Sequence, residues 1–126
     1  MKRILIVEDE QAMRDMYSRL LRSVGWKVVD VGDARGATNI LIRKELDLIL
    51  LDINIPEVDG QQMFEVIKEY DSNLKIIICS VYPIDKQKRM IPQATDYYDK
   101  SQGPFVLLTK VYNALILDEE SMSFSK

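Results

Sequence analysis

Short, mostly apolar runs alternate along this chain with longer segments whose apolar residues recur at helical spacing. The apolar runs lie at 4–7, 26–31, 48–51 and 74–79, and Tyr97 and Tyr98 mark a fifth. Strands without a polar face are typical of a parallel sheet that is covered by helices on both sides. The pattern therefore predicts an α/β domain with a doubly wound, five-stranded parallel sheet. In its fifth strand we expect one tyrosine to face the interior and the other to face outward, because strand side chains alternate.

The segments between these runs carry signals of helix boundaries. Asp33 is a candidate N-cap, and Gly25 suits the end of the helix before it. Pro104 fits the first position of the last helix, whereas Pro92 limits a short helix after Pro83. We expect helices at 10–24, from Asp33 to about 44, at 60–70, after Pro83, and from Pro104 onward.

Length and composition bound the class of protein. The 126 residues fit one domain, which we place at 1–117, with a polar tail at 118–126. Lys and Arg number 17 against 20 Asp and Glu, and the net charge of −3 lacks the basic footprint of nucleic-acid binding. The run at 4–7 is too short for a signal peptide, and no stretch approaches a membrane span. We therefore expect a cytoplasmic protein without nucleic-acid or membrane partners.

The chain has no histidine and one cysteine. The first fact excludes His-based acid–base catalysis, His metal ligands and a phosphohistidine on this chain. Any phosphoryl transfer that uses a histidine therefore needs one on another molecule. Cys79 alone cannot form an internal disulfide or a zinc site, and we expect it to be a buried strand residue.

Polar side chains gather where the predicted strands end. In open α/β sheets, ligands bind beyond the carboxyl ends of the strands, at the point where the strand order switches. Glu8 and Asp9 follow the first strand and Asp52 follows the third. If these two strands are neighbours, the three carboxylates converge. The other polar residues at strand ends are Glu10, Asn54, Asp59, Ser80 and Lys100.

Converging carboxylates repel one another. Two unit charges about 4 Å apart cost about 4 kcal/mol at an effective dielectric constant of about 20. A hard divalent cation resolves this repulsion, and Mg²⁺ keeps several waters beside a few carboxylates. Mg²⁺ together with Lys100 balances Glu8, Asp9 and Asp52. An aspartate is also a nucleophile toward phosphorus, so Asp52, a metal, Lys100 and the Ser80 hydroxyl are the parts of a phosphoryl-accepting site.

In this order and at these strand ends, the residues resemble the receiver domain of two-component response regulators. Glu8-Asp9 is similar to the family's acidic pair, and Asp52 lies where the family has its phosphoacceptor. Ser80 resembles its phosphate-binding hydroxyl, and Lys100 resembles its lysine. The match continues through Asn54, Pro56, Asp59, Gly60 and Tyr97, and covers residues 2 to about 117.

The resemblance implies a strand order of 2-1-3-4-5 and a set of roles. A partner histidine kinase or histidine phosphotransfer protein would phosphorylate Asp52, with Mg²⁺ or Mn²⁺ as the cofactor. Protein contacts on the face formed by the fourth helix, fifth strand and fifth helix would read out the change for a downstream protein target. The implied metal ligands are Glu8, Asp9, Asp52 and the backbone carbonyl of Asn54, and the implied phosphate-binding and switch residues are Ser80, Lys100 and Tyr97.

The length leaves no room for an output domain, so we expect a stand-alone receiver, monomeric or weakly dimeric. It would act by protein contact or as a relay step. It would not be an enzyme beyond assisting its own aspartyl phosphorylation and dephosphorylation. Tyr82, two residues after Ser80, is a candidate for gating the access of water to the site.

Two departures from the family pattern leave alternatives open. Val81 stands where the family usually has Ala, and Ser101 stands where it usually has Pro after a cis bond. A non-proline cis bond costs about 2.5–4 kcal/mol, so we expect a trans Lys100–Ser101 bond. The departures motivate an alternative function, a degenerate receiver that binds partners without phosphorylation, whereas the three acidic residues and Lys100 argue against it. A Mg²⁺-dependent phosphatase with an Asp nucleophile would need a second acid where Asn54 stands, to act as general acid. A flavodoxin-like flavin carrier would need free backbone amides for a phosphate where the acidic run 8–10 stands.

Overall fold

The computed structural model describes residues 1–56 and 58–117, and five parallel strands form one sheet in it. The strands are β1 (Arg3–Val7), β2 (Lys27–Val31), β3 (Leu48–Asp52), β4 (Lys75–Ser80) and β5 (Asp96–Asp99). Their order is β2-β1-β3-β4-β5, and every neighbouring pair is parallel. This confirms the predicted doubly wound α/β fold and its strand order.

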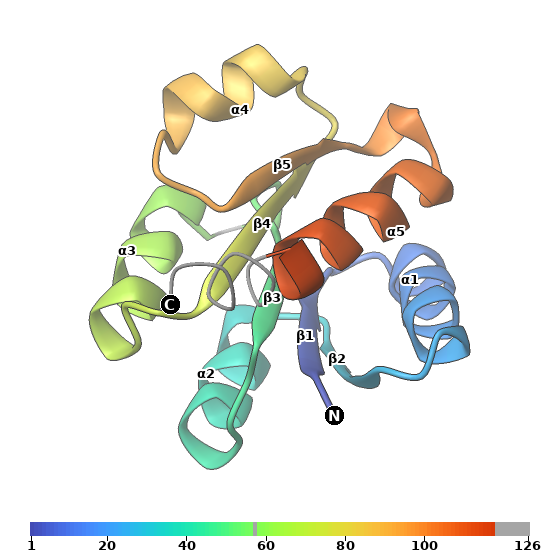
Figure 1. Cartoon of the computed structure of the whole chain (residues 1–126). Coiled ribbons are helices and arrows are strands. Elements are labelled where there is room, and N and C mark those ends of the chain that lie inside the picture. The colour runs from blue at the N-terminus through green and yellow to red at the C-terminus, as the bar shows by residue number, and fades with distance from the viewer. Residues whose placement is uncertain (57, 118–126) are drawn as a thin grey trace, which may run out of the picture.

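Helices connect the strands and cover both faces of the sheet. They are α1 (Gln11–Ser23), α2 (Ala34–Arg43), α3 (Gly60–Tyr70), α4 (Ile84–Met90) and α5 (Pro104–Tyr112), with a 3₁₀ turn at Lys100–Gln102 and a π-helical segment at Asn113–Leu117. Figure 1 shows α1 and α5 on one side of the sheet, α2 and α3 on the other, and α4 beside the edge strand β5. The carboxyl ends of the strands are therefore left free of helices and available for a site.

The helix boundaries agree with the predictions. α1, α2 and α3 begin and end within one residue of their predicted limits, and α4 is short, as expected between Pro83 and Pro92. The predicted tail at 118–126 lies outside the described residues, so the boundary at 117 stays a prediction. In the described part of the chain, no helix combines the length and the apolar character that crossing a membrane requires.

The side chains of each strand alternate between two hydrophobic cores, one on each face of the sheet. Leu5 and Ile49 point into the core beneath α2 and α3. Ile4 and Leu48 point into the core beneath α1 and α5. All four are at most 1% exposed. A strand that is buried on both sides needs apolar residues at every position, which explains the unbroken apolar runs.

The two tyrosines of β5 correct one expectation. Tyr97 and Tyr98 point to opposite faces of the sheet, but they are only 5% and 1% exposed. Tyr97 packs in the same core as Ile91, the C-cap residue of α4, and Tyr98 packs in the core beneath α1 and α5. The prediction of an outward-facing tyrosine is wrong, because both faces of this edge strand are covered.

Aspartate side chains cap two of the helices. Asp33 Oδ1 accepts the Gly36 N–H at 2.7 Å, as predicted for an N-cap. Asp59 Oδ1 accepts the N–H groups of Gln61 and Gln62 at 3.0 and 3.2 Å. A cap of this kind contributes about 1 kcal/mol. The second cap fixes the start of α3 directly after the loop that follows β3.

The burial of Cys79 makes a prediction about its reactivity. Its side chain is 2% exposed in β4, and burial raises the pKa of the thiol well above its usual range. Because the thiolate is the reactive form and the solvent cannot reach it, we expect a thiol reagent to label the native protein at least about 100-fold more slowly than the protein in denaturant. Labelling at a similar rate in the native and the denatured protein would contradict the burial of Cys79 in β4.

Candidate functional site

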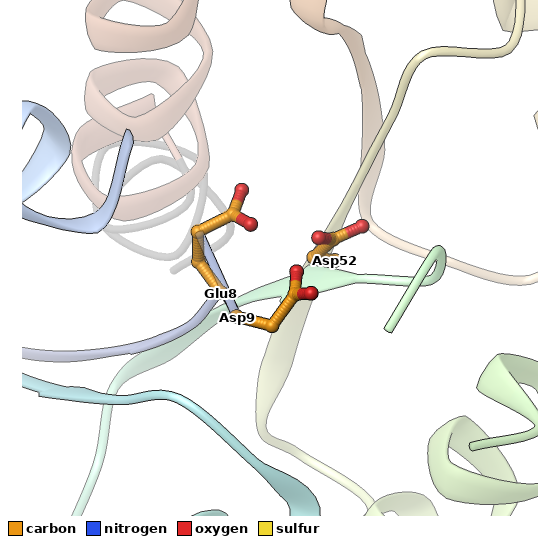
Figure 2. Close-up of side chains that lie close together, drawn as sticks. All are labelled: Glu8, Asp9 and Asp52. Atoms are coloured by element: carbon orange, nitrogen blue, oxygen red, sulfur yellow. The ribbon is translucent and has the colours of Figure 1, made fainter. Parts of the chain in front are cut away.

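The carboxyl ends of β1 and β3 bring three carboxylates together. Glu8 and Asp9 follow β1 directly, Asp52 is the last residue of β3, and the two strands are neighbours. One carboxylate oxygen from each of the three residues lies within 4.8 Å of the other two. Figure 2 shows the side chains of Asp9 and Asp52 directed toward each other, with Glu8 beside them. The convergence that the sequence predicts is present.

Lys100 reaches this cluster from the end of β5. Its Nζ lies 2.6 Å from Glu8 Oε1 and 3.2 Å from Asp52 Oδ2. The side chains of Lys100, Glu8 and Asp52 are 11%, 2% and 3% exposed, so the three charges form a buried ion triad. Removing one partner of a buried ion pair typically costs about 3–5 kcal/mol, because the other charge is left uncompensated.

Burial and neighbouring charges act together on the protonation of Glu8 and Lys100. The pKa of Glu8 is raised to about 7: burial is the largest cause, the hydrogen bond from Lys100 opposes it, and the nearby Asp52 adds to it. Burial alone would lower the pKa of Lys100, but the carboxylates of Glu8 and Asp52 outweigh it and raise that pKa. Lys100 therefore stays charged, and its one positive charge cannot balance the surrounding carboxylates.

The donor atoms of the cluster fit a hard divalent cation. Glu8, Asp9 and Asp52 offer only carboxylate oxygens, and Asp9 is exposed whereas the other two are buried. Mg²⁺ prefers oxygen ligands and keeps several waters, which the exposed side of Asp9 admits. One such ion and Lys100 would together balance the three carboxylates. The Asn54 N–H donates to Asp52 Oδ1 at 2.8 Å, and the Asn54 backbone carbonyl stays a predicted metal ligand.

The hydroxyl of Ser80, at the end of β4, is bonded to the side chain of Asn54. Ser80 Oγ donates to Asn54 Oδ1 at 2.6 Å and accepts the Tyr82 N–H at 3.0 Å. The Val81 N–H also points to Asn54 Oδ1, at 3.4 Å, while the Val81 side chain is 66% exposed. Sequence reasoning considered only the backbone of Asn54. Its side chain also accepts hydrogen bonds from the end of β4. The sequence signal for this second role was an amide two residues after Asp52, close enough to reach the neighbouring strand.

A 3₁₀ turn directs Lys100 back toward the carboxylates. Asp99 Oδ1 accepts the N–H and the hydroxyl of Ser101 at 2.9 and 2.7 Å, and Gln102 Oε1 accepts the Asp99 N–H at 3.3 Å. The two hydrogen bonds from Ser101 hold the pKa of Asp99 below its usual value. The described peptide bonds are all trans, including Lys100–Ser101, as expected. Asp99 therefore caps this turn, and Ser101, which stands where the family usually has proline, donates both hydrogen bonds to the cap.

Arg14 of α1 supports the acidic pair, and sequence reasoning missed it. Its Nη1 donates to the Glu8 carbonyl at 2.8 Å, while its Nε lies 3.5 Å from Asp30 Oδ1. The Glu8 side chain in turn accepts the Glu10 N–H at 3.1 Å through Oε2. These contacts fix both the backbone and the carboxylate of Glu8.

The two predicted aromatic site residues both contact α4 or the residues that follow it. The Tyr97 hydroxyl donates to the Ile91 carbonyl and accepts the Ala94 N–H at 3.2 Å. The Tyr82 ring lies 3.8 Å from Lys86 Nζ, measured to the ring centroid, which is a cation–π contact. The switch role of Tyr97 and the gating role of Tyr82 stay predictions.

Comparison with known proteins assigns the chain to a family. Residues 4–112 match the family described as the response regulator receiver domain. This chain belongs to that family. Receiver domains are components of two-component systems and act as signalling switches rather than as enzymes in the usual sense.

Individual relatives agree with this assignment. The uncharacterized transcriptional regulatory protein YbdJ of Bacillus subtilis is 31% identical over 114 residues, which are 90% of this chain and 50% of YbdJ. A CheY-like receiver domain protein from Methanospirillum hungatei JF-1 is 26% identical, with a TM-score of 0.87 over 96% of this chain and 98% of its own. The chain spans half or less of the length of several curated relatives, YbdJ among them.

One structural relative was solved with ligands and with a partner. The response regulator TrrA of Thermotoga maritima in complex with Mg²⁺-BeF is 28% identical, with a TM-score of 0.82 over 91% of this chain and 100% of TrrA. TrrA was also solved in complex with the histidine kinase ThkA. The TrrA chain of that complex is 28% identical, with a TM-score of 0.82 over 91% of the present chain and 99% of TrrA.

The acidic cluster predicts a response to metal that depends on Asp9. We expect Mg²⁺ at ten times its dissociation constant to raise the free energy of unfolding by about 1.4 kcal/mol, measured by urea denaturation. Asp9→Asn should remove most of this gain, and without metal it should stabilise the protein because it relieves repulsion. Asp15→Asn, an exposed change of the same charge on α1, is the control and should leave the gain intact. Equal gains in both variants would contradict a metal site at this cluster.

Proposed function

We propose that this chain is a phosphoryl-accepting signalling switch that is phosphorylated on Asp52 with Mg²⁺ as the cofactor. The observation that carries the proposal is the buried contact of Lys100 with Asp52 and Glu8, next to the exposed Asp9. This set combines a nucleophile, metal ligands and a fixed cation, which are the parts that phosphoryl transfer needs. The Mg²⁺-BeF complex of TrrA supports the choice of metal, and Mn²⁺ prefers similar oxygen ligands.

In the proposed reaction, an oxygen of Asp52 attacks the phosphorus of a phosphohistidine. The new O–P bond forms while the P–N bond breaks, and the imidazole nitrogen keeps the electron pair and takes a proton from water. The donor histidine lies on another protein, because this chain has none. When bound, Mg²⁺ offsets the repulsion between carboxylates and phosphoryl oxygens. Glu8 and Asp9 would hold it, while Lys100 would donate to a phosphoryl oxygen.

Ser80 has to change its hydrogen-bond partner in order to bind the phosphoryl group. Its hydroxyl has one hydrogen, which it donates to Asn54 Oδ1. Rotating that hydrogen toward a phosphoryl oxygen releases the Asn54 side chain. Because the Tyr82 N–H donates to the same hydroxyl, the change acts directly on the loop that leads into α4. Phosphorylation therefore has a physical route to that helix.

The surface formed by α4, β5 and α5 is the proposed read-out face. Tyr97 of β5 bonds to the Ile91 carbonyl at the end of α4. Lys110 of α5 donates to the Tyr97 carbonyl and lies 3.6 Å from Asp96 Oδ1. A residue of β5 is thus tied to both helices, so that a shift of one element acts on the others. The proposed partners are a sensor histidine kinase or histidine phosphotransfer protein and a downstream protein; the TrrA–ThkA complex supports the first.

The decisive experiment is intact-mass analysis after incubation with acetyl phosphate. We expect the protein to gain one phosphoryl group only when Mg²⁺ is present. Asp52→Asn should abolish the gain, whereas Asp15→Asn should retain it. If no condition produces a gain, the proposed switch is wrong in its active form. The alternative, a receiver that binds partners without phosphorylation, would then be favoured.

A second prediction separates the role of Lys100 from that of the metal ligands. We expect Lys100→Met to weaken the binding of beryllofluoride by about tenfold or more, because a hydrogen bond to a charged group contributes about 1.5–3 kcal/mol. Mg²⁺ affinity should stay equal or increase, because a competing positive charge is removed from Glu8 and Asp52. Isothermal titration calorimetry measures both, with the exposed Lys44→Met as control. If Lys100→Met weakened Mg²⁺ binding as much as beryllofluoride binding, the separation of Lys100 from the metal ligands would be wrong.

A further inference from the structure

Gln87 is a fully buried polar residue in an otherwise mostly polar and exposed helix. It lies in α4 between Lys86 and Lys88, both exposed, yet its own exposed fraction is 0%. Nothing in the local pattern distinguishes it from its neighbours. Burying a polar side chain is unfavourable unless it forms hydrogen bonds, so its contacts indicate why it is there.

The side-chain amide of Gln87 donates to two backbone carbonyls from different segments. Its Nε2 lies 2.8 Å from the Tyr82 oxygen and 3.0 Å from the Tyr98 oxygen. Because both neighbours are acceptors, only the NH₂ end of the amide can face them, and both of its hydrogens are used. Gln87 Oε1 is buried and has no hydrogen-bond partner among the described residues.

The first of these carbonyls belongs to the Ser80 side of the site. The Tyr82 N–H donates to Ser80 Oγ, and Ser80 Oγ donates to Asn54 Oδ1. The Asn54 N–H donates in turn to Asp52 Oδ1. A continuous series of hydrogen bonds therefore leads from Asp52, through the end of β4, to Gln87.

The second carbonyl belongs to the Lys100 side of the site. Tyr98 precedes Lys100 by two residues, and Lys100 Nζ lies 3.2 Å from Asp52 Oδ2. The hydrogen-bonded series starts at Asp52 Oδ1, whereas the second connection starts at Oδ2 and runs along the backbone from Lys100 to Tyr98; both end on the Gln87 amide. Gln87 therefore closes a ring around the site, and it does so from α4.

We propose that Gln87 is a positioning residue that sets the spacing between the Ser80 segment and the Lys100 segment for the incoming phosphoryl group. This inference rests on the proposed function, in which both residues bind phosphoryl oxygens. Two donors on separate segments bind one tetrahedral group well only when their separation is fixed beforehand. Gln87 provides that constraint, and its place in α4 links the same spacing to the helix of the proposed read-out face.

The test uses Gln87→Met, which keeps the length of the side chain and removes both hydrogen bonds. The variant also removes the unpaired buried Oε1, which favours a folded protein. We expect its affinity for beryllofluoride in the presence of Mg²⁺ to fall about tenfold. Its affinity for Mg²⁺ alone should stay within about twofold of the unmodified chain, since the Gln87 amide bonds directly to none of the predicted metal ligands. Isothermal titration calorimetry gives both values.

Ile91→Val is the matched control. It loosens apolar packing at the end of α4 without touching the Gln87 amide, and its beryllofluoride affinity should stay within about twofold. Equal losses in the two variants, or full affinity in Gln87→Met, would overturn the positioning role. If the unmodified chain binds neither Mg²⁺ nor beryllofluoride, the proposed function fails instead, which is a distinguishable result.

A measurement on the unmodified chain covers the case in which Gln87→Met does not fold. The side-chain NH₂ signals of Gln87 in nitrogen-15 NMR spectra should shift when beryllofluoride binds, because both carbonyl partners lie on segments that contact the ligand. Asn73, an exposed amide in the loop before β4 and so at the amino end of the strands, is the internal control and should not shift. Unchanged Gln87 signals at saturation would contradict the proposal.

Discussion

The buried ammonium group of Lys100 connects the ends of three strands, because it forms ion pairs with two carboxylates from the other two. Lys100 follows β5 and contacts Glu8 after β1 and Asp52 of β3. Parallel strands all end at the same edge, so their terminal side chains crowd together whatever their charge. One ammonium compensates only part of three carboxylates, and the remaining negative charge creates the demand for a divalent cation. The proposed phosphoryl chemistry depends on this incomplete balance.

The polar side chains of the site lie at or beyond the carboxyl ends of the strands, because apolar side chains pack on both faces of the sheet. Strand residues such as Ile4 and Leu5 are buried on opposite faces, under α1 and α5 or under α2 and α3. Several buried polar groups near the site form hydrogen bonds with one another or with the backbone. Ser80 is bonded to Asn54, and Gln87 to two backbone carbonyls. Such networks hold groups at fixed separations. In the proposed function, the same networks would connect the charge of a phosphoryl group on Asp52 to α4.

The accuracy of sequence reasoning followed the range of the interactions involved. The helix start at Asp33 was predictable because a cap is a contact within a few residues. The acidic cluster was predictable because the topology rule brings the ends of adjacent parallel strands together. The buried Gln87 was not, because its partners lie on the loop after β4 and on β5. The outward tyrosine of β5 was wrong for a related reason: alternation gives the direction of a side chain and not what covers it.

The sequence by itself determined the α/β class, the strand order implied by the family resemblance, and the identity of the residues at the strand ends. Apolar periodicity and local capping act between neighbours in the chain, so they can be read without coordinates. Only the tertiary structure decided which polar atoms meet. It assigned Lys100 to both Glu8 and Asp52, Ser80 to the Asn54 side chain, and Gln87 to the carbonyls on either side of the site. Those pairings depend on the packing of the elements, and distances between segments far apart in the chain are not encoded in any local pattern.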